Sequence, residues 1–252
     1  LLNKRMHKDP LFRTRFTDTM KEYIAKGFLE CVPEDELHNS QIDHYIPLHG
    51  VSHPRKDKLR IVFDAAARYP NESGNPVCIN DYLYDGPNDM NTLVGVLLRF
   101  RREYVPLVAD IESMYHMVKI HPKHERNALR VLWYEGDDID SEPITLRAAV
   151  HVFGVKSSGF VARKALKQTG IDNRDLLDAN VIEVLEDSFY VDDCLSSFPD
   201  ETTAIDMARN LIDLCSRGGF KLHKFDSSSK RVLDSIDENQ RASNNVTRSE
   251  EH

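Results

Sequence analysis

The sequence predicts an α+β fold, in which a β-sheet carries helices on one face. The order of the elements predicts this class, and the composition predicts that the chain folds. From residue 104 onward, β-rich runs and helical stretches follow one another in the order β-α-β-β-α-β, and a further helix and strand come after them. Hydrophobic residues make up 40% of the 252-residue chain, which is enough to bury a sizeable core and too much for a wholly disordered chain.

The N-terminal part of the chain predicts one helix and one hairpin. Residues 11–28 carry apolar side chains at helical spacing, and Gly27 lies near the end of that stripe. The β-rich runs 45–48 and 59–63 stand on either side of a basic stretch, which indicates two strands joined by a cationic loop. Residues 66–88 are rich in Pro, Gly, Asn and Asp and are expected to form a loop.

The remaining elements follow the alternation that defines the class. Residues 89–102 predict a helix with Asp89 or Asn91 near its N-cap, and the apolar run 104–109 predicts a buried strand that ends in Asp110. The later predicted elements are a helix over 111–120, a strand over 129–134, a strand within 143–153, a helix over 156–168, two strand halves over 188–196 and a helix over 201–217 that is ended by two glycines. From about Asp234 the chain is polar and is predicted to be disordered.

Three aspartates stand in strand runs, where aspartate is disfavoured. Asp110 ends one run, and Asp192 and Asp193 interrupt another between apolar neighbours. An aspartate pair also suits a tight turn, and this alternative stays open for Asp192 and Asp193. If the two runs are neighbouring strands, the carboxylates converge, and a hard cation such as Mg²⁺ or Mn²⁺ is needed between them. The pattern therefore indicates phosphoryl or nucleotidyl transfer assisted by two metal ions.

Eight sequence blocks carry further information through their order. They are YIPLHGV (45–51), KLRIVFDAAAR (58–68), NDYLYDGP (80–87), LLRFR (97–101), ADIESMYHMVKI (109–120), VFGVKSS (152–158), FYVDDCLS (189–196) and GGFKLHKF (218–225). Tyr190-Val191-Asp192-Asp193 is similar to the Y-x-D-D motif of reverse transcriptases, and the blocks together resemble the polymerases of BEL/Pao-type LTR retrotransposons. The resemblance covers roughly residues 1–236. It implies a right-hand polymerase palm, an antiparallel sheet with helices on one face, with a fingers subdomain and a missing or truncated thumb.

The resemblance implies an RNA-directed DNA polymerase that adds dNTPs to a primer 3′-hydroxyl. The matching metal ligands are Asp110, Asp192 and Asp193, together with the backbone carbonyl of Ile111. The implied cofactor is a pair of Mg²⁺ ions, with Mn²⁺ as a substitute. Lys224 matches a lysine that protonates the leaving pyrophosphate, and the reading as an ordinary surface lysine stays open.

The resemblance also implies a set of residues that bind the dNTP. Arg60 matches the arginine that clamps the triphosphate, and Lys56 is its companion on the hairpin tip. Tyr115 matches the aromatic residue that excludes a ribose 2′-hydroxyl, and Phe153 with Gly154 occupy the place of the Gln-Gly step of many retroviral enzymes. Without the resemblance, Arg60 and Lys56 are read as solvated charges and Tyr115 as a core tyrosine.

The implied organisation is an N-terminal helical segment (1–40), fingers and the fingers–palm connection (41–100), a palm with the catalytic carboxylates (101–236) and a polar, disordered tail (237–252). The implied partners are an RNA or DNA template with its primer, dNTPs, and the protease, RNase H and integrase domains of a polyprotein. No membrane partner is expected. The implied location is the cytoplasm, in a virus-like particle, or the nucleus. The alternative is a catalytically inactive remnant, or an exapted fold, that serves as a binding module.

The net charge of −8 by itself argues against a generic nucleic-acid coat protein, which would normally be basic. The distribution of the charges along the chain changes this interpretation. Acidic residues gather around Asp192 and Asp193, whereas basic residues cluster at 53–60 and 99–102. This pattern is compatible with a metal-neutralised centre beside a cationic region. The four cysteines lie far apart without a C-x-x-C pair, so that neither a zinc ribbon nor a dense disulfide framework is expected.

Overall fold

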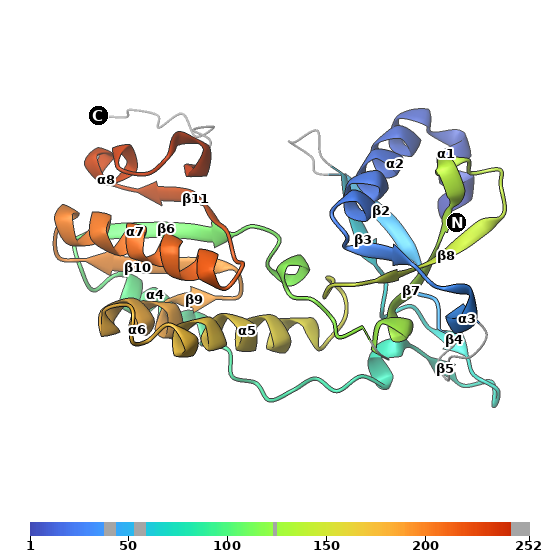
Figure 1. Cartoon of the computed structure of the whole chain (residues 1–252), viewed down its shortest axis with the longest axis horizontal. Helices are drawn as coiled ribbons and strands as arrows, with labels where there is room; N and C mark the ends of the chain where they lie inside the picture. Colours follow the sequence, from blue (N-terminus) through green and yellow to red (C-terminus); the bar gives the residue numbers. More distant parts are fainter. Residues whose placement is uncertain (38–43, 53–58, 123–124, 243–252) are drawn as a thin grey trace. The chain divides into compact units, whose positions relative to one another are not determined.

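The computed structural model describes residues 1–37, 44–52, 59–122 and 125–242. They form two compact units (Figure 1). Unit 1 comprises Leu1–Gly86 and Tyr115–Ser158, and unit 2 comprises Pro87–Met114 and Gly159–His252. Each unit has its own sheet and its own set of buried side chains.

Unit 1 combines helices with a three-stranded sheet and a hairpin. Its helices are α1 (Leu2–Lys8), α2 (Pro10–Ala25) and α3 (Glu34–Leu37). The sheet has the order β1 (Leu29–Cys31), β8 (Pro143–Ala148), β7 (Arg130–Tyr134), and the hairpin joins β2 (Leu48–Ser52) to β3 (Leu59–Phe63). All of these strand pairs are antiparallel. The connections contain the short strands β4 (Tyr69–Pro70) and β5 (Pro76–Val77).

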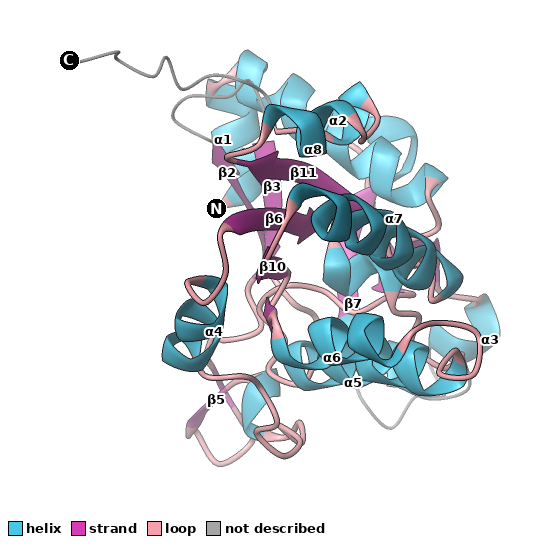
Figure 2. Cartoon of the chain, turned by 90° about the vertical axis from the view of Figure 1, so that its left-hand side faces the viewer, coloured by secondary structure: helices cyan, strands magenta, loops and turns pink. Residues whose placement is uncertain are grey.

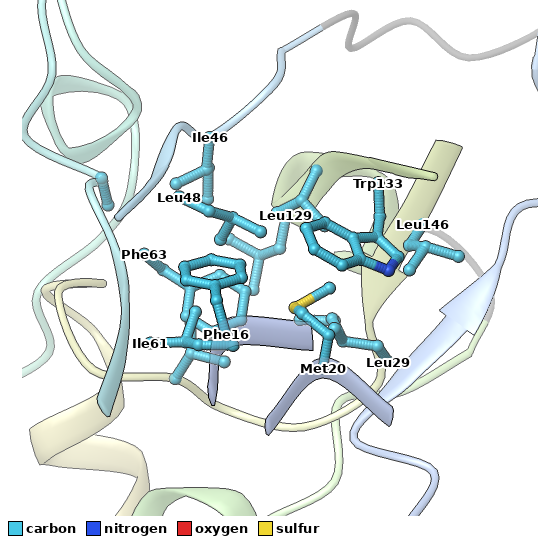
Figure 3. Close-up of a cluster of buried hydrophobic side chains, with 14 of the residues drawn as sticks. Phe16, Met20, Leu29, Ile46, Leu48, Ile61, Phe63, Leu129, Trp133 and Leu146 are labelled. Atoms are coloured by element: carbon cyan, nitrogen blue, oxygen red, sulfur yellow. The ribbon is translucent and has the colours of Figure 1, made fainter. Parts of the chain in front are cut away.

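Helix α2 forms where the sequence predicts it because its start is capped and one of its faces is apolar. The Asp9 carboxylate accepts a hydrogen bond from the Phe12 N–H at 2.9 Å, and Pro10 occupies the first turn. Phe12 and Phe16 are buried on one face of the helix. The ring of Phe16 lies 5.4 Å from that of Trp133 on β7. Around this pair the core gathers side chains from α2, the hairpin and the sheet (Figure 3), among them Met20, Leu29, Ile46, Leu48, Ile61, Phe63, Leu129 and Leu146.

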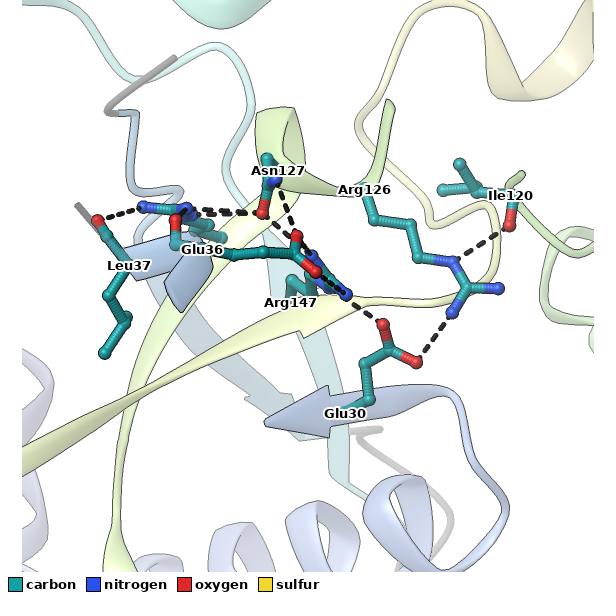
Figure 4. Close-up of polar contacts among 8 residues, drawn as sticks. Glu30, Glu36, Leu37, Ile120, Arg126, Asn127 and Arg147 are labelled. Atoms are coloured by element: carbon teal, nitrogen blue, oxygen red, sulfur yellow. Dashed lines mark hydrogen bonds and ion pairs between the residues drawn. The ribbon is translucent and has the colours of Figure 1, made fainter. Parts of the chain in front are cut away.

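A network of charged side chains ties α3 to the three-stranded sheet (Figure 4). Arg147 on β8 donates from Nε to Glu30 Oε1 on β1 at 2.8 Å, and its Nη1 donates to Glu36 on α3. The other Glu30 oxygen accepts from Arg126 at 2.6 Å. The Arg147 side chain is only 6% exposed, so its charge depends on these two glutamates for compensation.

Unit 2 is built on a four-stranded antiparallel sheet. The strand order is β11 (Leu222–Ser227), β6 (Val105–Ile111), β10 (Asp193–Phe198), β9 (Phe189–Tyr190). The helices are α4 (Leu93–Phe100), α5 (Ser158–Asp172), α6 (Ala179–Asp187), α7 (Glu201–Arg217) and α8 (Lys230–Asp234). Helix α7 runs alongside the sheet (Figure 2) and packs against β6, β10 and β11.

The two faces of this sheet are covered unequally. Along β6 the side chains of Leu107, Ala109 and Ile111 are buried, whereas Val108 and Asp110, which alternate with them, are only half-buried. Successive strand residues point to opposite faces, so this alternation is typical of a sheet with one fully covered face. Asp110 therefore lies on the less covered face.

The sequence-based expectation places Asp89 or Asn91 near the start of α4, and the structure shows which residue caps the helix. Its N-cap is Thr92, whose hydroxyl accepts from the Gly95 N–H at 3.2 Å, and not Asp89 or Asn91. The Asp89 carboxylate instead pairs with Lys167 at 2.8 Å. The Asn91 amide donates to two backbone carbonyls at the end of α6 and in β9. Both candidate caps are thus engaged by partners that are distant in sequence.

Other elements also depart from the prediction. The first hairpin strand begins at Leu48, because Tyr45 and Ile46 pair with Arg130 of β7 instead. The expected helix over 111–120 is a single 3-10 turn, Met114–Met117. Helix α6 has no counterpart among the predicted elements, since its apolar residues run directly into the strand that follows.

The compact units also cut across the expected segments. Residues Tyr115–Ser158 of the predicted palm segment, 101–236, belong to unit 1, because β8 pairs with β1 as well as with β7. Within the predicted disordered tail, Glu238–Gln240 form a 3-10 turn and Arg241 forms a β-bridge with Phe225 of β11. The segment 243–252 lies outside the described residues. Across the described ranges, no helix has the length and apolarity to cross a membrane.

Candidate active site

A row of polar residues crosses the sheet of unit 2 near one end of its strands. Asp110 on β6 is the direct cross-strand partner of Asp193 on β10 and of His223 on β11. Asp193 is paired in turn with Tyr190 on β9. Direct partners in antiparallel strands project from the same face, with Cβ atoms about 5 Å apart. Asp110, Asp193 and His223 therefore line one region, and β6 and β10 are the neighbouring strands that the sequence predicts.

Asp192 lies with Val191 in the two-residue turn between β9 and β10. Val191 has a φ of +56°, in the left-handed region that β-branched residues rarely adopt. Hairpin turns of this length require positive φ, so backbone strain of about 1–3 kcal/mol is held at the tip. The Asp192 carbonyl accepts a hydrogen bond from the Ile111 N–H at 2.8 Å. This bond holds the turn against the end of β6.

The carboxylates of the row interact electrostatically. Loss of hydration, together with the negative charges of Asp192 and Asp110, raises the pKa of the Asp193 carboxyl above its usual value. The Lys224 ammonium opposes this rise. Loss of hydration is the largest of these causes, and the repulsion by the two neighbouring carboxylates adds to it.

Strand β11 supplies two consecutive residues to one carboxylate. The His223 ring nitrogen Nε2 lies 2.6 Å from Asp110 Oδ1, and Lys224 Nζ lies 2.8 Å from Asp110 Oδ2. Consecutive residues of a regular strand point to opposite faces. Here the strand register shifts between His223 and Asp226, and Lys224 has a φ of +53°. This irregularity brings both side chains to Asp110.

The chemistry of the row suits a divalent cation, because carboxylate oxygens are the ligands that Mg²⁺ prefers. Their mutual repulsion is a second reason why a cation would be favoured there. The arrangement is nevertheless not that of a closed site: within the part of the chain that the structure describes, no three His, Cys, Asp or Glu side chains form a group that could hold a metal ion. His223 and Lys224 lie against both oxygens of Asp110 instead.

A second group of predicted residues lies in unit 1. The rings of Tyr115 and Phe153 are 4.4 Å apart, and the Arg60 guanidinium on β3 lies 5.6 Å from the centre of the Phe153 ring. A guanidinium over an aromatic face is held by cation–π attraction. His116 follows Tyr115 and packs on Phe28, with 4.8 Å between ring centres. Burial, assisted by the charge of Lys26, lowers the pKa of His116 to about 4.

Gly154 is required by its surroundings. Its φ is +97°, and a Cβ atom at this position would lie 2.3 Å from the backbone oxygen of Phe63. The loop is held further by Asn80, whose side chain donates to the Gly154 carbonyl at 2.9 Å and accepts from the Lys156 N–H at 3.0 Å. Gly154 therefore allows β3 and the loop after β8 to approach closely.

The structure thus divides the predicted site residues between the units. Unit 2 brings together Asp110, Ile111, Asp192, Asp193 and Lys224, and unit 1 brings together Arg60, Tyr115, Phe153 and Gly154. Lys56 lies outside the described residues. Sequence reasoning missed His223. It belongs to a block that the resemblance includes, but strand alternation would place it and Lys224 on opposite faces.

Comparison with known proteins shows which fold this is. No family model matches the chain, and neither does any curated protein. Among solved structures, the prototype foamy virus protease–reverse transcriptase (CSH mutant) is similar with a TM-score of 0.63 and 14% identity, over 88% of this chain and 25% of that one. The foamy viral protease–reverse transcriptase dRH, in complex with double-stranded DNA, is similar with a TM-score of 0.56 and 15% identity, over 83% of this chain and 30% of that one.

The chain spans between a quarter and a third of the length of these neighbours. At such identities the likeness shows the fold alone. The chain has a mixed α/β fold with antiparallel sheets, of the kind seen in retroviral reverse transcriptases.

Proposed function

We propose that the chain is the reverse transcriptase domain of a BEL/Pao-type retrotransposon polyprotein, an RNA-directed DNA polymerase. The observation that carries the proposal is the register of β6 and β10, which pairs Asp110 with Asp193 beside the turn residue Asp192. Two-metal nucleotidyl transfer needs carboxylates in such an arrangement. The similarity to reverse transcriptase structures supports assigning it to this reaction rather than to another phosphoryl transfer.

In this proposal the sheet of unit 2 belongs to the palm and the β2–β3 hairpin to the fingers. Asp110, Asp192 and Asp193, with the Ile111 carbonyl, would hold two Mg²⁺ ions, for which Mn²⁺ can substitute. When bound, the ions would lower the pKa of the primer 3′-hydroxyl and stabilise the charge of the triphosphate. Lys224 would carry a proton on Nζ and hand it to the departing pyrophosphate oxygen.

The group in unit 1 would bind the incoming nucleotide. The Arg60 guanidinium lies 5.6 Å from the centre of the Phe153 ring, and its paired N–H donors suit the oxygens of a phosphate group. Lys56 would be a second cationic residue that binds the triphosphate. Tyr115 would lie under the sugar and exclude a 2′-hydroxyl, and its ring is held at 4.4 Å from Phe153. The closely packed Gly154 loop would keep the Phe153 ring in position.

The proposal includes the partners of a retroelement polymerase. They are an RNA or DNA template with its primer, dNTPs, and the protease, RNase H and integrase domains of a polyprotein. One foamy viral neighbour was solved with double-stranded DNA, which supports a nucleic-acid partner. The proposed location is a virus-like particle in the cytoplasm, with the nucleus as a second location.

The test is the addition of a single nucleotide to a primer–template. The concentrations of the protein and of the primer–template are kept high, so that weak binding does not limit the reaction. We expect addition that depends on Mg²⁺ and is lost in Asp192→Asn. The matched control is Asp175→Asn, an exposed aspartate between α5 and α6, and it should keep the activity. Binding of the primer–template without any addition would refute the polymerase and favour the inactive binding module. Cleavage of nucleic acid without dNTP would instead point to a nuclease.

A further inference from the structure

The contacts of Asp110 raise a question about how a metal ion reaches it. Both carboxylate oxygens already have cationic or polar partners, His223 at 2.6 Å and Lys224 at 2.8 Å. The two partners, which we name the carboxylate clamp, are neighbours in sequence. A regular strand would offer only one of them to Asp110, so the clamp depends on the register shift in β11 and on the left-handed backbone of Lys224.

The clamp compensates an otherwise unfavourable arrangement. Like charges placed directly opposite each other on paired strands are destabilising, and Asp110 is directly opposite Asp193. The Asp110 side chain is only 20% exposed, so that water screens this repulsion incompletely. An ammonium group and a ring N–H at its two oxygens offset the repulsion in the absence of any ion.

We propose that the carboxylate clamp is a built-in competitor of the divalent cation, and that metal binding at Asp110 displaces Lys224. This inference rests on the proposed function, since it assumes that Asp110 is a metal ligand. A cation bound to Asp110 needs at least one of the oxygens that the clamp occupies. The ammonium and the metal ion compete for that oxygen, because two positive charges at such short range repel each other.

The structure indicates which half of the clamp leaves. The Lys224 side chain is 52% exposed and has a long flexible stem, so it can turn into solvent. His223 is 22% exposed, and its backbone is in register with Asp110. His223 therefore stays as a positioning residue that orients the carboxylate. The displaced ammonium remains at the edge of the row, where the proposed reaction needs a proton donor.

The first experiment measures Mn²⁺ binding at one pH and one ionic strength, from the electron paramagnetic resonance signal of free Mn²⁺ and without nucleotide. Only the sites that disappear in Asp110→Asn are counted. We expect Lys224→Met to bind Mn²⁺ about 5-fold more tightly, which is about 1 kcal/mol, the upper range for a partly exposed ion pair. The matched control is Lys221→Met, which removes an equal charge from a lysine that pairs with Glu112 at 2.8 Å. An equal gain in both variants, or no gain in either, overturns the proposal.

The second experiment uses the unaltered chain, so it does not depend on the folding of a variant at Lys224. Acylation of lysine amines is followed by mass spectrometry with and without Mg²⁺. We expect Mg²⁺ to increase the labelling rate of Lys224 several-fold relative to that of Lys221. Equal rates with and without Mg²⁺ overturn the clamp.

The two proposals fail in different ways. If no Mn²⁺ site depends on Asp110, the proposed polymerase loses its metal centre, and the clamp loses its purpose with it. If the site depends on Asp110 but does not respond to Lys224→Met, only the clamp fails. Primer extension by the unaltered chain, measured separately, then still supports the polymerase.

Discussion

Burial of His116 makes the stability of unit 1 depend on pH. The residue is 8% exposed and lies among aromatic rings, with ring centres 5.2 Å from Tyr23 and 4.8 Å from Phe28. Burial, and to a lesser extent Lys26, lowers the pKa of His116 to about 4, against 6.5 for an exposed histidine. Between these values the unfolded chain takes up a proton that the folded chain does not.

The sign and the size of the effect follow from linkage. Above pH 6.5 the ring is neutral in both states and the shift costs nothing. As the pH falls toward 4, protonation favours the unfolded chain, so that the free energy of unfolding decreases. Each pH unit is worth about 1.4 kcal/mol, which makes the loss about 2 kcal/mol at pH 5 and roughly 3 kcal/mol at pH 4.

Trp133 makes this prediction measurable. It is the single tryptophan of the chain, it is 1% exposed, and it lies in the core of unit 1. Its fluorescence in urea therefore reports the unfolding of that unit. Because other groups also titrate, the quantity to compare is the difference between the wild type and His116→Phe. We expect this difference to shift by about 2 kcal/mol in favour of the variant between pH 7.5 and pH 5.

The control is Phe28→Leu, which removes one aromatic contact of His116 without adding or removing a titratable group. It should lower the free energy of unfolding by a similar amount at both pH values, provided that the smaller side chain leaves His116 buried. A difference between wild type and His116→Phe that does not change with pH would refute the reasoning.

Two further predictions concern the stability of unit 1, measured through Trp133 fluorescence in urea. Gly154→Ala should lower the free energy of unfolding of unit 1 by more than about 2 kcal/mol. The added Cβ would lie 2.3 Å from the Phe63 carbonyl oxygen, and the backbone at this position has a positive φ. A loss below about 0.5 kcal/mol would show that the loop can move away and would contradict this reasoning. Arg147→Met should cost about 1.5–3 kcal/mol, since it removes the charge-assisted hydrogen bonds to two glutamates that stay partly exposed. Lys26→Met, which breaks an exposed helical pair, should cost only about 0.3–0.5 kcal/mol, and similar losses in both variants would contradict the argument.

Several features of the fold could be read from the sequence because their causes are local. The apolar stripe that becomes α2 needs only helical spacing and the Asp9 cap. Helix α7 is capped by Asp200, whose carboxylate accepts from the Thr203 N–H, and a pair of glycines follows its last residue. The two strand runs that contain the aspartates can also be recognised, because Asp110, Asp192 and Asp193 stand among apolar residues.

Other features of the fold could not be predicted from local sequence patterns, because contacts with residues distant in sequence decide them. Asp89 and Asn91 are good capping residues, yet Lys167 and the carbonyls of Glu186 and Phe189 engage them. Likewise, the residue range Tyr115–Ser158 joins unit 1 through the pairing of β8 with β1. Local propensity is worth tenths of a kcal/mol, which tertiary hydrogen bonds and burial readily exceed.

The sequence by itself determined which residues carry the candidate chemistry: the three aspartates, Lys224 and the aromatic residues of the second group. Only the tertiary structure decided what surrounds them. The contacts of Asp110 with His223 and Lys224 join residues 113 and 114 positions apart and depend on an irregular strand register. Helical and strand periodicity acts over a few neighbouring residues, whereas strand pairing and bulges depend on how distant segments meet. For this reason the sequence locates the carboxylates, and the folded sheet decides what neutralises them.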